Sequence, residues 1–220
     1  MDDIKPINLN RIYLFNDNHK IFYSVNPLKE FLNFIKMTQN RKNIEFCYSC
    51  EEDSLHQNLS VKENFILDAV PKSLIRDGED NFKQFLLTLK NPHLKELIFF
   101  IQDLNASISS LSHEQLKLVS IVKSLLSQSE YILFLAPDKD MRPEALVIIK
   151  KAIQFEVYNR KRNVLIKAEN RDLWLDISGH IIMKCESSHL FSSSVNPLFE
   201  LPTKDLPNQE MIDSPLKVVA

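Results

Sequence analysis

Glycine is nearly absent from this chain, which contains only Gly78 and Gly179 among its 220 residues. Ordinary globular proteins carry roughly 7% glycine. Loops that wrap phosphate groups with backbone N–H groups need several glycines close together in the sequence. The two glycines here lie far apart, so the sequence argues against conventional nucleotide chemistry.

Charge and composition narrow the class of protein further. The chain carries 27 basic and 29 acidic residues, which predicts no nucleic-acid partner. Three cysteines are too few for a disulfide framework and are typical of a reducing compartment. No apolar run reaches the length of about 18 residues that would span a membrane, and the first ten residues lack the pattern of a signal peptide. We therefore expect a cytoplasmic protein.

The hydrophobic pattern predicts strands that alternate with helices. This alternation is typical of an α/β fold with a mostly parallel sheet flanked by helices. We expect one domain over residues 1–186, with a small helical lobe at about residues 60–110, and an extended Ser/Pro-rich tail over 187–220. The expected strands are 7–15, 20–25, 44–50, 131–135, 163–168 and, as the last, 180–185; the expected helices begin at Asn26-Pro27 and cover 60–75, 79–90, 94–104, 112–127 and 140–159.

Residues 110–141, SLSHEQLKLVSIVKSLLSQSEYILFLAPDKDM, resemble a stretch of ABC-type ATPases. In that family an LSGGQ signature begins a helix, and the buried strand that follows ends in Asp-Glu-Pro. Leu111, Ser112 and Gln115 keep three signature positions, and Pro137 keeps the proline at the family's spacing.

Two further segments resemble the same family. Residues 51–67 are similar to the segment that starts at the Q-loop and enters the helical lobe, and residues 163–170 to the strand that carries the switch histidine. The resemblance covers roughly residues 7–190. It implies a P-loop NTPase-like, ABC ATPase-like fold, similar to the single-domain ATPases of lipoprotein-export and cell-division complexes.

The sequence departs from this family at the residues that perform its chemistry. Strand 20–25 runs into a short turn without glycine, where Lys29 matches the phosphate-binding lysine but Glu30 replaces the hydroxyl that binds magnesium. The resemblance thus implies a degenerate ATPase that needs no cofactor and no metal. The other replacements are Glu51 for the Q-loop glutamine, His113 and Glu114 for the signature glycines, Leu135 for the magnesium-orienting aspartate, Ala136 for the general-base glutamate and Glu169 for the switch histidine.

Active members of this family bind a cytoplasmic helix of a membrane subunit in the groove between their lobes. If that groove is retained, we expect a membrane-protein partner near Glu51, Leu55, Phe65 and Phe99. Phe99 falls off the apolar stripe of its helix and therefore either packs under a loop or faces outward. The leading hypothesis is a catalytically inactive interaction subunit, peripheral to the inner membrane of a bacterium.

Several alternatives remain open. The chain could form a homodimer, be the degenerate half of a heterodimer with an active ABC-type ATPase, or be an enzyme of unrelated chemistry on the same fold.

Cys47 and Cys50 form a C-x-x-C pattern, which we interpret as strand residues in preference to a metal or redox pair. We interpret the basic turn 159–162 as a solvated helix end in preference to a phosphate site. We also expect Leu135 and Ala136 to be packed.

Overall fold

The computed structural model describes residues 12–15, 45–49, 54–69, 80–184 and 191–196. Six strands in these residues form one sheet with the order β2-β3-β4-β1-β5-β6. Five neighbouring strands are parallel, and β6 is antiparallel to β5. The strands are β1 (Ile12–Phe15), β2 (Phe46–Ser49), β3 (Tyr131–Leu135), β4 (Asn163–Lys167), β5 (His180–Lys184) and β6 (Phe191–Val195).

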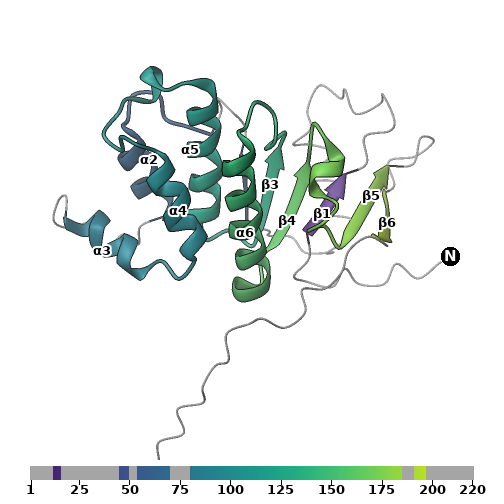
Figure 1. Cartoon of the computed structure of the whole chain (residues 1–220). Coiled ribbons are helices and arrows are strands. Elements are labelled where there is room, and N and C mark those ends of the chain that lie inside the picture. The colour runs from purple at the N-terminus through teal and green to yellow at the C-terminus, as the bar shows by residue number, and fades with distance from the viewer. Residues whose placement is uncertain (1–11, 16–44, 50–53, 70–79, 185–190, 197–220) are drawn as a thin grey trace, which may run out of the picture.

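Helices flank the sheet and also form a separate group beside it. Figure 1 shows α2, α3 and α4 gathered on the far side of α5 and α6 from the strands. The predicted α/β architecture with a mostly parallel sheet is therefore confirmed. The helices are α2 (Val61–Ala69), α3 (Asp80–Thr88), α4 (Pro92–Phe100), α5 (His113–Leu126) and α6 (Pro143–Arg160), with short 3-10 helices η3 (Ile108–Ser110) and η4 (Arg171–Trp174).

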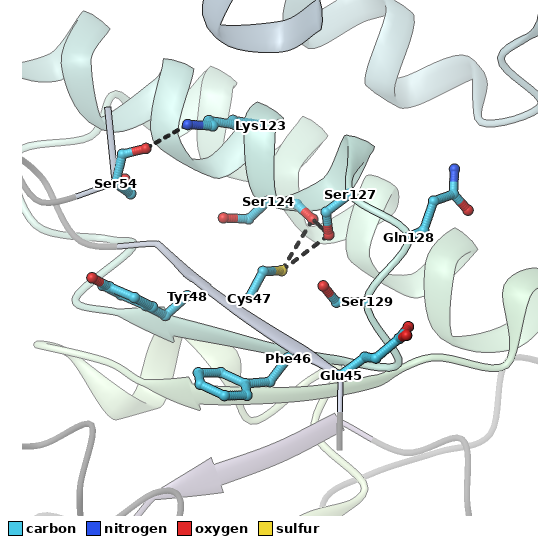
Figure 2. A pocket seen from close by; sticks show the side chains of 10 residues that line it. All are labelled: Glu45, Phe46, Cys47, Tyr48, Ser54, Lys123, Ser124, Ser127, Gln128 and Ser129. Carbon is cyan, nitrogen blue, oxygen red and sulfur yellow. Dashed lines mark hydrogen bonds between the residues drawn. The ribbon is translucent and has the colours of Figure 1, made fainter. Parts of the chain in front are cut away.

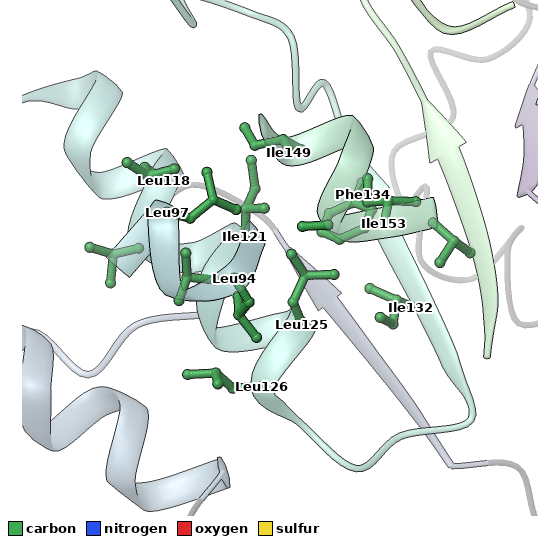
Figure 3. Packing of buried hydrophobic residues seen from close by; sticks show 14 of the residues in the cluster. Leu94, Leu97, Leu118, Ile121, Leu125, Leu126, Ile132, Phe134, Ile149 and Ile153 are labelled. Atoms are coloured by element: carbon green, nitrogen blue, oxygen red, sulfur yellow. The ribbon is translucent and has the colours of Figure 1, made fainter. Parts of the chain in front are cut away.

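The main hydrophobic core lies between the sheet and helices α5 and α6. Because successive side chains of a strand point to opposite faces, Ile132 and Phe134 of β3 point toward these helices. Figure 3 shows both side chains opposite Leu125 of α5 and Ile153 of α6. Tyr131 and Leu133 belong to a second cluster, on the other face of the sheet.

The helical lobe is built on apolar stripes and on one buried amide. The ring of Phe65 lies 6.5 Å from that of Phe82, which lies 6.2 Å from that of Phe85. The side chain of Asn64 is fully buried; it accepts from the backbone N–H of His56 at 2.8 Å and donates to the carbonyl of His56 at 3.1 Å. These contacts fix the entry of the chain into the lobe.

One strand lies where the sequence predicted a tail. β6 (Phe191–Val195) pairs with β5 over five residue pairs, so the expectation that 180–185 would be the last strand was wrong. Its consecutive serines have little β preference, and the backbone ladder to β5 holds this edge strand instead. The predicted strand 20–25 and the helix from Asn26-Pro27 lie outside the described residues.

Candidate functional site

The turns after β3 and β4 lie together at the carboxyl edge of the sheet. In parallel α/β sheets, ligands bind at this edge. The two strands are neighbours, with Leu135 opposite Lys167. The backbone N–H of Ala136 donates to the carbonyl of Lys167 at 2.6 Å. The carboxylate of Asp138 accepts the backbone N–H groups of Glu169 at 3.0 Å and of Asn170 at 2.6 Å.

The structure thus brings Leu135, Ala136 and Glu169, three of the replaced family positions, into one region. Leu135 is half-buried and packs against the second apolar cluster, as predicted, and Ala136 is also half-buried. Ala136 has a positive φ of 44°, which ends β3 in a sharp turn at the edge of the sheet. Glu169 is exposed. Two hydrocarbon side chains and one solvated carboxylate therefore occupy the positions that the resemblance assigns to an acid, a base and a switch histidine.

The segment that resembles the ABC signature begins helix α5. Ser112 is its N-cap residue and forms a capping box with Gln115. The backbone N–H of Gln115 donates to Ser112 Oγ at 3.3 Å, and the N–H of Ser112 donates to Gln115 Oε1 at 3.0 Å. Leu111 is half-buried and packs against the main core. Three residues that resemble the signature therefore have a structural role in starting this helix.

The two residues at the signature glycine positions contact the loop between β3 and α6. His113 Nε2 lies 3.7 Å from Asp140 Oδ2. Glu114 Oε1 accepts both the side-chain Nε–H of Arg142 at 2.8 Å and its backbone N–H at 3.1 Å. The guanidinium of Arg142 also lies 5.7 Å from the ring centre of Phe100 at the end of α4. This loop is therefore tied to the start of α5 and to the helical lobe.

The pKa of Glu114 reflects this contact. Partial burial alone would raise the pKa of the carboxyl group, but the side-chain and backbone hydrogen bonds from Arg142, with its charge, lower it below the ordinary value. Glu114 is thus ionised at neutral pH and already engaged by a cation of its own chain. Lys29, Glu30 and Glu51, the other family positions, lie outside the described residues. Within the described part of the chain, no group of three His, Cys, Asp or Glu side chains could hold a metal ion.

The residues predicted to bind a partner have very different environments. Phe65 is fully buried and Leu55 is 6% exposed, so both belong to the core and their interpretation as partner contacts was wrong. Both lie near the junction of the sheet and the helical lobe, where the hydrophobic effect favours burial of their side chains in the core. Phe99 is 81% exposed and points off the inner stripe of α4, one of the two orientations that the sequence left open.

A cavity of about 660 Å³ lies beside the segment that leads into the lobe, between the outer edge of β2 and the end of α5. Figure 2 shows Lys123 beside Ser54 in the lining, where the Nζ of Lys123 donates to the carbonyl of Ser54 at 2.7 Å. Cys47 Sγ accepts from Ser127 Oγ at 3.1 Å and lies 3.4 Å from the carbonyl of Ser124. Cys47 is therefore a strand residue that packs on α5, as predicted; Cys50 lies outside the described residues.

Sequence reasoning missed a buried ion pair at the opposite edge of the sheet. Arg162 is 4% exposed, and its Nη1 donates to Glu156 Oε2 at 3.1 Å and to the carbonyl of Leu125 at 2.8 Å. Burial lowers the pKa of the guanidinium, and the charge of Glu156 opposes this shift. The interpretation of the turn 159–162 as a solvated helix end was therefore wrong for Arg162. The sequence signal for this ion pair was Glu156, which falls on the inner face of α6 six residues before Arg162.

The chain matches no protein-family model, and no curated protein matches it in sequence. Its fold, in contrast, matches many solved structures. The dimeric ATP-binding cassette MJ0796, in a post-hydrolysis state bound to ADP and Pi, aligns with a TM-score of 0.59 at 16% identity over 80% of this chain and 82% of that one. The chain has an ABC ATPase-like fold.

Two other structures support the same assignment of fold. The ATP-binding subunit of an ABC transporter gives a TM-score of 0.60 at 12% identity, over 84% of this chain and 79% of that chain. A putative metal-chelate type ABC transporter in an inward-facing conformation gives 0.56 at 11% identity, over 86% of this chain and 74% of that chain. In the described part of this protein, no helix has both the length and the apolar character needed to cross a bilayer.

Proposed function

We propose that this protein is a catalytically inactive ABC ATPase-like protein that acts as an interaction subunit of a bacterial membrane-associated complex. The observation that carries the proposal is the end of β3, where Leu135 and Ala136 place hydrocarbon at the carboxyl edge of the sheet. ATP hydrolysis on this fold requires a carboxylate that orients magnesium and a second group that positions the attacking water. Neither side chain supplies an oxygen for these tasks.

The charged groups near this edge are already engaged, which supports the same proposal. Asp138 accepts two backbone N–H groups, and Glu114 is bound by Arg142. Glu169 would add negative charge where a polyphosphate would have to approach. The proposal is thus supported by two carboxylates at this edge that already have partners and by two side chains, Leu135 and Ala136, that supply no ligand.

Exposure of Phe99 supports the interaction role. A large aromatic side chain that is 81% exposed gains nothing from folding, whereas burial in a partner would remove its apolar surface from water. The proposed partner is a membrane-protein subunit whose cytoplasmic segment binds at the groove between the lobes. This protein would then be cytoplasmic and peripheral to the inner membrane.

The second candidate is the degenerate half of an ATPase dimer, which could pair with itself or with an active ABC-type ATPase. It is favoured by the likeness to a cassette whose structure is dimeric. The two candidates differ in one measurable property. A dimer subunit would change the rate of ATP hydrolysis by the active ABC-type ATPase with which it pairs. A membrane-complex subunit would instead co-purify with a membrane protein and would not change the rate of ATP hydrolysis by that ATPase.

Nucleotide chemistry is tested directly with the purified full chain. We expect no heat of binding for Mg-ATP in calorimetry, no rise in melting temperature with millimolar Mg-ATP, and no phosphate release. An active ABC ATPase serves as the positive control, and the Leu135→Asp/Ala136→Glu double variant tests whether two restored carboxylates suffice. A melting temperature that rises by several degrees in the wild-type protein would refute the loss of nucleotide binding.

The interaction role is tested by affinity purification from native membranes. Phe99→Ala should reduce capture of the co-purifying membrane protein at least about tenfold, since one anchoring aromatic contributes about 2 kcal/mol or more. Leu173→Ala is the matched control, because Leu173 is a partly exposed apolar residue of η4, outside the helical lobe. Equal capture by both variants would exclude Phe99 from the interface.

A further inference from the structure

A second hollow, of about 510 Å³, lies where the end of α3 and the start of α4 meet the end of α6. Helix α6 runs from the loop after β3 to the start of β4, so its end marks the amino edge of the sheet. The hollow is therefore at the opposite edge from Leu135 and Ala136. It is independent of the site on which the proposed function rests.

The floor of this hollow is apolar. Leu89 and Phe155 line it and are both half-buried, above the buried side chains of Phe85 and Leu94. Small-molecule and side-chain pockets of a few hundred Å³ are typically apolar with a few placed polar groups. An inorganic anion or a free phosphate would leave this apolar surface uncovered, so the occupant has hydrocarbon of its own.

The mouth of the hollow is positively charged. Glu156 is the acidic residue among its described lining, and it is fully buried, with its carboxylate bound by Asn91, Arg160 and Arg162. Two arginines thus compensate one carboxylate. Lys90 is exposed at the mouth, and the side chain of Arg160 is 31% exposed.

Arg160 retains hydrogen-bonding capacity for an incoming group. Its Nη1 donates to Glu156 Oε2 at 3.1 Å and its Nη2 to Gln128 Oε1 at 3.0 Å. A guanidinium has five N–H donors in all. The amino end of α4, capped by Asn91, also lies at this hollow, and the positive end of a helix dipole favours a carboxylate.

We propose that this hollow binds an acidic peptide segment of a partner protein. An apolar side chain of the segment enters between Leu89 and Phe155, and the carboxylates beside it bind Lys90 and Arg160. A basic peptide would meet the like charges of Lys90 and Arg160 at the mouth, and a neutral apolar peptide would bring no counter-charge for the exposed Lys90. The charge of the mouth and the apolar floor together select this one class of ligand.

The test uses the full chain and phage-displayed random 12-residue peptides. Selection is run in parallel on the wild-type protein, Lys90→Glu and Lys151→Glu. Lys151 is the matched control because it is exposed on α6 and does not line the hollow. We expect the wild-type protein and Lys151→Glu to enrich peptides in which Asp or Glu flanks Leu, Phe or Met, and Lys90→Glu to lose them.

The enriched peptides are then synthesised, and their affinity is measured by fluorescence anisotropy. Lys90→Glu and Arg160→Gln should each weaken binding by about fivefold or more, while Lys151→Glu leaves it within about twofold. Melting curves establish that each variant is folded. The proposal is overturned if no peptide is enriched, if the enriched peptides carry no acidic residue, or if all variants bind them equally.

Discussion

The carboxylate of Asp138 accepts the backbone N–H of Glu169 at 3.0 Å, which joins the turn after β3 to the turn after β4. Its second oxygen accepts the N–H of Asn170 at 2.6 Å. Both turns belong to the edge of the sheet where the ABC resemblance places the catalytic groups. In this protein a carboxylate at that edge binds its own backbone, so the edge is stabilised without a ligand.

Removal of this carboxylate should cost measurable stability. Asp138→Ala leaves two backbone N–H groups without their charged acceptor, but water can reach them because the contact is exposed. We expect a loss of about 1 kcal/mol in the free energy of unfolding, measured by urea denaturation. Asp172→Ala is the control, since that carboxylate is 78% exposed and makes only a 3.7 Å ion pair. Equal losses would show that the Asp138 contacts contribute nothing.

The Glu114–Arg142 contact should make stability depend on pH. The folded state lowers the pKa of Glu114, so the stability from its charged form is present at neutral pH and is lost as the pH falls through that lowered pKa. Glu114→Gln should therefore melt below the wild-type protein at pH 7, and the difference should shrink in acid below the ordinary range of a glutamate. Melting curves from pH 7 to pH 3 check this. A difference that does not change with pH would assign the effect to packing.

The scarcity of glycine has a visible structural consequence. Among the described residues, three that are not glycine have positive φ, namely Ala136, Asp140 and Lys161. Lys161 ends α6 in the left-handed conformation that glycine usually adopts at helix ends of this kind. Lys161→Gly should therefore raise the free energy of unfolding by about 1 kcal/mol. Lys151→Gly, in the middle of the same helix, should lower it by about 1 kcal/mol; loss of stability in both variants would contradict the argument.

Strong local patterns explain which elements were predictable. The five apolar residues of β3 match the observed strand, Tyr131–Leu135, and the apolar stripe that predicted a helix over 112–127 matches α5, His113–Leu126. The edge strand β6 was missed because its serines carry no hydrophobic signal and its pairing with β5 depends on the backbone. Sequence alone therefore predicts elements that bury their own side chains and misses those held by a neighbour.

The candidate site shows the same division. The resemblance assigned Leu135, Ala136 and Glu169 to catalytic positions of the family, and they share one edge because β3 and β4 are neighbouring parallel strands. It did not predict the contacts of Glu114 with Arg142 or of Asp138 with Glu169, which depend on how the loop after β3 turns. The resemblance also did not separate Phe65 from Phe99, since burial depends on the packing of the whole lobe.

The buried ion pair between Arg162 and Glu156, at the amino edge of the sheet, should contribute more to stability than the partly exposed pair between Arg160 and Glu156. Arg162→Leu removes the main counter-charge of Glu156, and we expect a loss of about 3–5 kcal/mol, because a buried carboxylate loses its partner. Arg160→Gln should lose about 1 kcal/mol or less, since that guanidinium is 31% exposed and screened by water. Urea denaturation of both variants checks the order. The double variant Glu156→Gln/Arg162→Leu should recover part of the loss, and failure to do so would point to packing as the cause.

Phe99 and Phe65 should respond in opposite ways to truncation. Phe65 is fully buried and stacks on Phe82, so Phe65→Ala removes buried hydrocarbon and should lower the free energy of unfolding by about 3–5 kcal/mol. Phe99 is 81% exposed, so Phe99→Ala should change it by less than about 0.5 kcal/mol. Urea denaturation of both variants distinguishes the two environments within one lobe. A large loss for Phe99→Ala would make Phe99 part of the core, and an exposed aromatic surface could then no longer support the proposed partner.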